Sequence, residues 1–148
     1  MILVTGSAGF IGHAVCAALL ARGEAVTGLD NFNAYYDPAL KRARVHTLKG
    51  ARGFSQVEAD LADRAALAAL LTRCRPDRIV HLAAQAGVRY SFENPDAYTS
   101  SNLVGFANLC RRRASMRRCA TWYTRRPPAS TGATRSCLFR STIRSSSH

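Results

Sequence analysis

The sequence predicts an α/β fold in which a parallel sheet is doubly wound, with helices on both faces. Short apolar segments alternate with segments of helical character, which is typical of successive βαβ units. A turn containing Gly6, Gly9 and Gly12 joins the first apolar segment to the first helix. Polar loops follow the later strands, and right-handed crossovers place such loops along one edge of the sheet, where ligands bind.

The four expected strands are short apolar runs bounded by turn-forming or polar residues. Ile2–Thr5 and the segment 25–29 are uncharged and apolar on both faces, as buried parallel strands are. Phe54–Glu58 is the third candidate, and Arg78–Leu82 is the fourth. The segments between strands and helices at residues 31–37 and 83–94 are expected to be loops.

The first two helices are delimited by glycine and proline. One helix is expected from Gly9 to about Arg22, and Gly23 ends it. Pro38 fits the first turn of a second helix over residues 38–48, and the basic residues of this helix are expected on its outer face.

The last two helices have a capping aspartate and an opening proline. Asp63 is expected to cap a helix through an Ala- and Leu-rich run that ends at Leu71. Pro95 opens the last helix, whose apolar positions are Tyr98, Leu103, Val104, Phe106 and Leu109.

The glycine turn predicts a site for a pyrophosphate. One glycine permits a sharp turn, another lets the phosphate approach the backbone, and the third lets helix and strand pack closely. Free N–H groups in the first turn of the helix then face the anion. Asp30 follows Gly12 at the end of the second strand, where its carboxylate accepts bonds from a ribose and repels a 2′-phosphate. We therefore expect a Rossmann fold that binds NAD rather than NADP; the alternative is an ordinary turn with chance glycines.

The net charge of +12 is unevenly distributed along the 148 residues. All acidic residues lie within residues 1–110, where they nearly balance the basic ones, whereas residues 111–148 contain arginine and no acid. We expect a partial NAD-binding domain over 1–110 and a basic, irregular tail over 111–148. The charge balance of the front domain argues against a nucleic-acid partner for it.

The cysteines and the hydropathy pattern indicate the cellular compartment in which the protein is expected. Five cysteines, an odd number without metal-ligand spacing, indicate free thiols in a reducing, cytoplasmic environment. Cys16 is expected to be a small buried residue of the first helix. The uncharged N-terminal stretch lacks a basic start and contains three glycines, so we expect a phosphate loop rather than a signal peptide, and no membrane segment.

Five motifs, in order, resemble the extended short-chain dehydrogenases. They are Thr5-Gly6-Ser7-Ala8-Gly9-Phe10-Ile11-Gly12, Asp30-Asn31, Asp60-Leu61, His81 to Ser91 and Asn102-Leu103-Val104-Gly105. The aromatic loop Asn31–Pro38 and the run Ala83-Ala84-Gln85-Ala86-Gly87-Val88-Arg89-Tyr90-Ser91 are most similar to the UDP-glucuronate 4-epimerase branch of the NAD-dependent nucleotide-sugar epimerases. The resemblance covers residues 1 to about 109.

The resemblance implies roles for individual residues. Cofactor-binding positions would be Gly6, Gly9, Phe10, Ile11 and Gly12 at the pyrophosphate, Asp30 and Asn31 at the adenosine ribose, Asp60 and Leu61 at the adenine, Leu82, Ala83, Ala84 and Gln85 at the nicotinamide, and Asn102 at the floor of the site. Arg89 and Ser91 would face a UDP-sugar substrate. The guanidinium of Arg89 suits this role, because it can form bidentate hydrogen bonds with a carboxylate or phosphate.

Structural alternatives apply to several of these positions. Asp60 could be a simple helix cap and Arg89 a solvated loop charge. His81, inside an apolar strand, is expected to be a core histidine, and His13 is also expected to be structural. Members of this family act as homodimers, which is the oligomer that the resemblance implies.

The catalytic base of the family is missing from the sequence. The family uses a tyrosine four residues before a lysine, with the lysine lowering the tyrosine pKa. The two lysines of this chain, Lys41 and Lys49, follow Asp37 and Val45 at that spacing. No catalytic residue is therefore assigned, and we expect an NAD-binding portion without epimerase turnover.

The tail has the composition of GC-rich DNA read out of frame. Starting each codon from Thr121 to Gly132 one base earlier permits His-Leu-Val-Tyr-Ala-Ser-Ser-Ser-Ser-Val-Tyr-Gly, the fifth-strand motif of the family. We therefore expect a frameshift near residue 110, which the coding DNA would test. It follows that the edge of the fourth strand should be unpaired. Two alternatives to a truncated epimerase remain. One is a non-catalytic NAD-binding module, and the other is a protein whose genuine tail binds nucleic acid through arginines and the aromatics Trp122 and Tyr123.

Overall fold

A computed structural model describes residues 1–114, 121–125 and 138–140, with side chains up to residue 111. The strands are β1 (Ile2–Thr5), β2 (Val26–Asp30), β3 (Phe54–Glu58), β4 (Arg78–His81), β5 (Thr121–Arg125) and β6 (Leu138–Arg140). The helices are α1 (Phe10–Ala21), α2 (Pro38–Leu48), α3 (Arg64–Cys74), α4 (Val88–Glu93), α5 (Pro95–Thr99), η1 (Ser100–Val104) and α6 (Gly105–Ala114). The predicted strands and helices of the front domain are therefore confirmed within a few residues at their ends.

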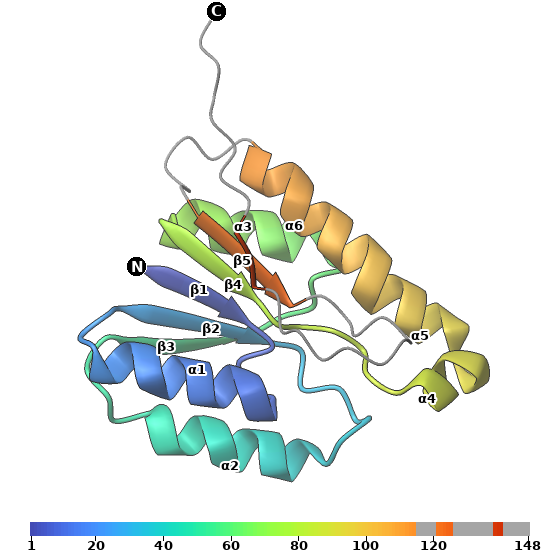
Figure 1. Ribbon diagram of the computed structural model, residues 1–148, viewed down its shortest axis with the longest axis horizontal. Coiled ribbons are helices and arrows are strands. Elements are labelled where there is room, and N and C mark those ends of the chain that lie inside the picture. The colour runs from blue at the N-terminus through green and yellow to red at the C-terminus, as the bar shows by residue number, and fades with distance from the viewer. Residues whose placement is uncertain (115–120, 126–137, 141–148) are drawn as a thin grey trace, which may run out of the picture.

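The strands form one sheet in the order β3-β2-β1-β4-β5-β6 (Figure 1). Strands β1 to β5 are parallel, and β6 is antiparallel to β5. The strand order reverses beside β1, which is the switch point at which doubly wound sheets bind ligands. The predicted Rossmann arrangement is confirmed.

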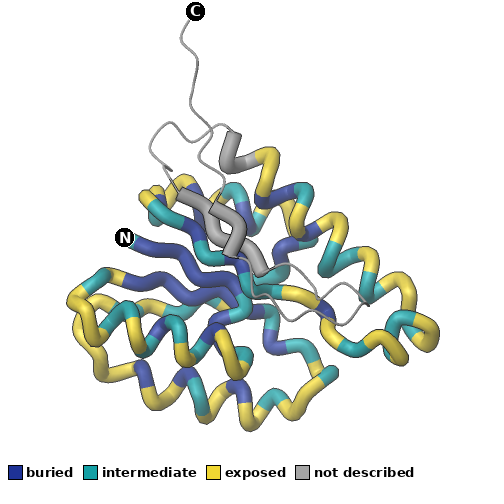
Figure 2. Tube along the Cα trace, viewed as in Figure 1, coloured by how far each residue is buried: buried dark blue, intermediate teal, exposed yellow. Residues whose placement is uncertain are grey.

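Each face of the sheet has its own apolar core. Ile2 and Val4 point to the face that α1 and α2 cover, where Cys16 and Leu48 are also buried. Leu3 points to the opposite face, against α3 and α6. Both sides of β1 are thus shielded from water, which explains its uninterrupted apolar sequence. Figure 2 shows the result: the central strands are dark blue, and the outer surfaces of the helices are largely yellow.

The prediction of an unpaired β4 edge is wrong. β5 lies parallel to β4, with Arg78 opposite Thr121 and His81 opposite Thr124. The segment Thr121-Trp122-Tyr123-Thr124 is rich in β-branched and aromatic residues, which favour strands. Such residues can pair with an available edge whatever their origin. Of the rest of the predicted tail, residues 115–120, 126–137 and 141–148 lie outside the described residues.

Part of the expected loop 83–94 is a short helix. α4 begins after Gly87, whose φ is +96°. Serine, tyrosine and arginine give this segment little helical periodicity, so its helical turns depend on packing. One such contact joins the rings of Tyr90 and Tyr35, whose centroids are 4.8 Å apart.

The start of α3 gives a local test of the capping prediction. The Asp63 carboxylate accepts hydrogen bonds from the N–H groups of Ala65 and Ala66, both at 2.9 Å. Asp63→Ala should lower the free energy of unfolding by about 1 kcal/mol, the usual contribution of an N-cap. Urea unfolding measures it. Arg64→Ala, an exposed neighbour, is the control and should change stability by less than about 0.5 kcal/mol; equal effects would contradict the cap.

Candidate functional site

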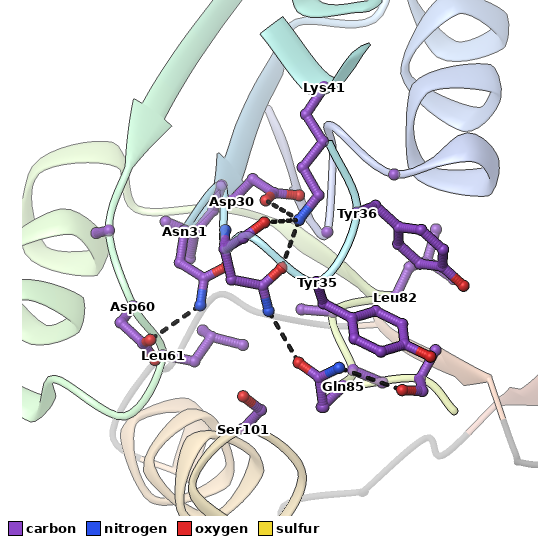
Figure 3. A pocket seen from close by; sticks show the side chains of 18 residues that line it. Asp30, Asn31, Tyr35, Tyr36, Lys41, Asp60, Leu61, Leu82, Gln85 and Ser101 are labelled. Carbon is purple, nitrogen blue, oxygen red and sulfur yellow. Dashed lines mark hydrogen bonds and ion pairs between the residues drawn. The ribbon is translucent and has the colours of Figure 1, made fainter. Parts of the chain in front are cut away.

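A pocket lies at the carboxyl ends of the central strands (Figure 3). It is lined by residues of the β1–α1 turn, the loops after β2, β3 and β4, and the first turn of η1. Its predicted members are Gly6, Gly9, Asp30, Asn31, Asp60, Leu61, Leu82, Ala83, Ala84 and Gln85. Segments separated by up to 95 residues in sequence, from Gly6 to Ser101, therefore meet where the topology directs them.

The backbone packs so closely around the glycine turn that a side chain at Gly6 or Gly12 would not fit. Gly6 has φ +71°, and a Cβ there would lie 2.7 Å from the nitrogen of Ala83. A Cβ on Gly12 would overlap the carbonyl oxygen of Gly6 and lie 2.7 Å from its carbonyl carbon. α1 thus packs directly on the turn. Gly9, its N-cap, makes no side-chain capping bond, and the first turn has no acidic residue.

The Asp30 carboxylate is held rigidly at the end of β2. Its Oδ2 accepts a hydrogen bond from the N–H of Ala8 at 3.1 Å, and its Oδ1 accepts one from the N–H of Phe32 at 2.9 Å. The Lys41 Nζ lies 3.9 Å from Oδ1. A carboxylate has about four lone-pair positions, so capacity remains for hydroxyl donors from a ligand.

Asn31 and Asp60 connect the loops after β2 and β3. The Asn31 side-chain amide donates to Asp60 Oδ2 at 2.9 Å, while Asp60 Oδ1 accepts from the N–H of Ala62 at 2.7 Å. Asp60 therefore orders its own loop, and the cap of α3 is Asp63 instead. Leu61 is buried beside them and contributes an apolar wall.

The loop after β4 is fixed by Asn102 of the π-helical turn η1. The Asn102 Oδ1 accepts from the N–H of Gln85 at 2.8 Å, and its Nδ2 donates to the Gln85 carbonyl at 3.1 Å. Both backbone groups of Gln85 are thereby satisfied by one side chain. Asn102 itself does not line the pocket, whereas its neighbour Ser101 does. Asn102 acts by positioning Gln85.

Lys41 is a member of the pocket that the sequence prediction missed. We expected the basic residues of α2 on its outer face, but Lys41 is only 7% exposed. Its Nζ donates to the Asn33 carbonyl oxygen at 3.1 Å and to Asn33 Oδ1 at 2.6 Å. The signal was present, because Lys41 precedes the buried Val45 and Leu48 by four and seven residues, on one face of the helix.

The aromatic loop after β2 closes one side of the pocket. Tyr35 and Tyr36 line it, with ring centroids 4.7 Å apart, and Tyr35 also packs on Tyr90 of α4. The Asn33 amide donates to Gln85 Oε1 at 2.9 Å, so the loops after β2 and β4 meet above the sheet. None of these contacts was predicted, because they depend on two loops meeting in space.

Several predicted residues lie outside the pocket lining. Phe10, 78% exposed, and Ile11 begin α1 at the surface, and Gly12 packs beneath the turn. Arg89 is exposed on α4, and the Ser91 hydroxyl donates to the carbonyl of Val88 in the same helix. Neither Arg89 nor Ser91 is among the residues that line the pocket.

His81 and His13 make structural contacts, as expected for these two residues. His81 is buried in β4, its Nδ1 lies 2.7 Å from Thr5 Oγ1, and its ring stacks on Phe106. Burial lowers the His81 pKa to about 4. His13 Nε2 contacts the Thr47 hydroxyl at an exposed position. Neither histidine lines the pocket.

The remaining observations concern the Cys16 thiol, metal binding and membrane spans. Cys16 is buried within α1, and burial raises its pKa to about 12, which keeps it a thiol. Among the described residues, no group of His, Cys, Asp and Glu has the proximity of metal ligands. None of the helices described here has the length and hydropathy needed to cross a membrane.

Comparison with known proteins agrees with the fold. Residues 3–132 match the family described as GDP-mannose 4,6 dehydratase. UDP-glucuronate 4-epimerase 1 of Arabidopsis thaliana is 54% identical over 108 residues, which are 73% of this chain and 25% of that protein. A probable UDP-glucuronate 4-epimerase of Rhizobium meliloti (strain 1021) is 50% identical over 107 residues, 72% of this chain and 31% of that protein.

A solved structure is also similar to a large part of this chain. It is the UDP-glucuronic acid 4-epimerase from Bacillus cereus in complex with UDP-glucuronic acid and NAD, with a TM-score of 0.68 and 34% identity. The match covers 75% of this chain and 35% of that one. The chain thus spans about a quarter to a third of the length of these relatives.

Proposed function

Because this chain belongs to the GDP-mannose 4,6-dehydratase family, we propose that its pocket binds NAD as the cofactor site of a nucleotide-sugar epimerase. The glycine turn and the Asp30 carboxylate, which both line the pocket and are joined by the hydrogen bond from the Ala8 N–H, carry this proposal. A pyrophosphate needs backbone N–H groups without side-chain competition, and a ribose needs a fixed acceptor. The first turn of α1, which has no side-chain cap and no acidic residue, and the fixed Asp30 carboxylate support the proposal.

The proposed NAD site gives each predicted residue a proposed role. Gly6, Gly9, Phe10, Ile11 and Gly12 would flank the pyrophosphate; Asp30 and Asn31 would bind the adenosine ribose, and Asp60 and Leu61 the adenine. Residues 82–85 would lie along the nicotinamide, positioned by Asn102. Phe10 and Ile11 need not line the enclosed pocket for this role, because their backbone N–H groups begin α1.

The proposed substrate class is a UDP-sugar, and the proposed reaction of the intact protein is epimerisation at C4 of UDP-glucuronate. When bound, NAD supplies a hydride acceptor and donor for that carbon. Arg89 and Ser91 would face the sugar nucleotide after a rearrangement of α4, since Arg89 is now exposed to solvent. The identity to two UDP-glucuronate 4-epimerases supports this substrate class.

Calorimetric titration with NAD⁺ tests the proposal. We expect saturable binding with a micromolar Kd and no conversion of UDP-glucuronate, because neither Lys41 nor Lys49 follows a tyrosine at the required spacing. Absence of NAD⁺ binding by folded protein would refute the cofactor proposal. Measured turnover would instead refute the proposed lack of a catalytic base.

A second candidate function rests on the arginines of residues 111–148, which no acidic residue balances. Such a segment binds nucleic-acid phosphates with an affinity that falls steeply with salt. Titration with duplex DNA at two salt concentrations separates this activity from cofactor binding. Salt-sensitive DNA binding without NAD⁺ binding would favour it.

A further inference from the structure

Asp30 fills a small anion-binding site with its own carboxylate. Two backbone donors bind its two oxygens: the N–H of Ala8 donates to Oδ2 and the N–H of Phe32 donates to Oδ1. The buried Lys41 ammonium stands beside them, 3.9 Å from Oδ1 (Figure 3). Two N–H donors and one cation are a typical environment for a phosphate group. Here they surround a side-chain carboxylate instead.

The positive charge of Lys41 is fixed in place independently of Asp30. Its Nζ donates to both the carbonyl and the side-chain oxygen of Asn33, at 3.1 and 2.6 Å. Asn33 is held in turn by Gln85. Removing the Asp30 carboxylate would therefore leave the ammonium where it is, buried and without its counter-ion, beside two N–H groups that have lost their acceptor.

We propose that Asp30 masks a latent phosphate site that the Lys41 ammonium completes, and that this masking maintains the preference for NAD over NADP. This inference rests on the proposed cofactor site. Asp30 rejects a ribose 2′-phosphate in two ways, by like charge and by occupying the donors that a phosphate would use. Without Asp30, the N–H groups of Ala8 and Phe32 and the Lys41 ammonium form a latent site for a nucleotide 2′-phosphate.

The direct test measures the Kd of NAD⁺ and NADP⁺ for wild type, Asp30→Ala, Asp30→Ala/Lys41→Met and Asp30→Ala/Lys49→Met. Asp30→Ala should raise the ratio of NADP⁺ to NAD⁺ affinity by at least about tenfold, as one charge-assisted hydrogen bond would. Adding Lys41→Met should remove this gain. Lys49, exposed at the end of α2, is the matched control, and its replacement should preserve the gain.

A second readout does not depend on dinucleotide binding. Inorganic phosphate should raise the Tm of Asp30→Ala, leave the Tm of wild type unchanged, and lose its effect when Lys41→Met is added. If wild type fails to bind NAD⁺, the cofactor proposal fails, but the phosphate effect still decides the anion site. Asp30→Asn, which retains the shape and one acceptor, replaces Asp30→Ala if the latter does not fold.

Three results would overturn the inference. One is an unchanged affinity ratio in the Asp30 variants, although wild type binds NAD⁺. Another is a gain for NADP⁺ that survives Lys41→Met. The third is a phosphate effect on Tm that is the same with and without Lys41.

Discussion

Gly12→Ala should weaken NAD⁺ binding severely, although alanine is the better helix former by about 1 kcal/mol. The new Cβ would overlap the Gly6 carbonyl oxygen and lie 2.7 Å from the Gly6 carbon and 3.0 Å from the Ser7 Cα. These are backbone atoms, so α1 or the turn must move as a whole. Overpacking costs about 1–3 kcal/mol. We expect NAD⁺ affinity to fall by about a hundredfold or more, equivalent to ~3 kcal/mol.

The matched control for this prediction is Gly50→Ala. Gly50 lies in the turn after α2, and a Cβ there would meet no atom within 4 Å. Calorimetry should give the same Kd for this variant as for wild type, and thermal unfolding by circular dichroism should give a similar Tm. Retention of wild-type affinity by Gly12→Ala would show that the close packing of α1 on the turn is unimportant for the cofactor.

The front half of the fold could be predicted because its signals are local. The apolar run Ile2-Leu3-Val4 can be buried only as a strand covered on both faces, and Asp63 lies one residue before the helix it caps. Chain order and crossover handedness then bring the loops after the strands to one edge. Asp30, Asp60 and Gln85 meet there as expected.

The parts that were missed depend on contacts between distant segments. The position of Lys41 follows from an interior polar network with Asn33 and Asp30, whereas lysine on a helix ordinarily faces water. α4 is supported by Tyr35, which belongs to a different loop. β5 pairs with β4 in a region beyond the motifs that carried the predicted resemblance, which was expected to end near residue 109, whereas the family match extends to residue 132. In each case a contact partner that is distant in sequence, rather than the local sequence, determines the position or the secondary structure of the segment.

His81 should make the fold sensitive to mild acid. Thr5 Oγ1 lies 3.3 Å from the N–H groups of both Leu82 and Ala83 and accepts from them. Its single proton is therefore directed at His81 Nδ1, 2.7 Å away, which makes Nδ1 an acceptor and the imidazole neutral. Protonation of Nδ1 would place two donors face to face within the apolar core.

The sign of the pH effect follows from the two pKa values. Burial lowers the His81 pKa from 6.5 to about 4, so between these values the unfolded chain binds a proton that the folded chain does not. Stability is full above pH 6.5, decreases as the pH falls toward 4, and then levels off for this group. Each pKa unit corresponds to about 1.4 kcal/mol, so the expected loss is about 3 kcal/mol.

Urea unfolding of wild type and His81→Asn between pH 4 and 7.5 measures this contribution. Asparagine can present an oxygen to the Thr5 hydroxyl where Nδ1 does, but it does not titrate in this range. The variant should be less stable at neutral pH, because the stacking of the imidazole on Phe106 is lost. Its stability should nevertheless fall by about 3 kcal/mol less than that of wild type between pH 7.5 and 4. Parallel pH profiles would mean that the pKa of His81 is the same in the folded and unfolded chains, and that the Thr5–His81 bond does not stabilise the neutral imidazole.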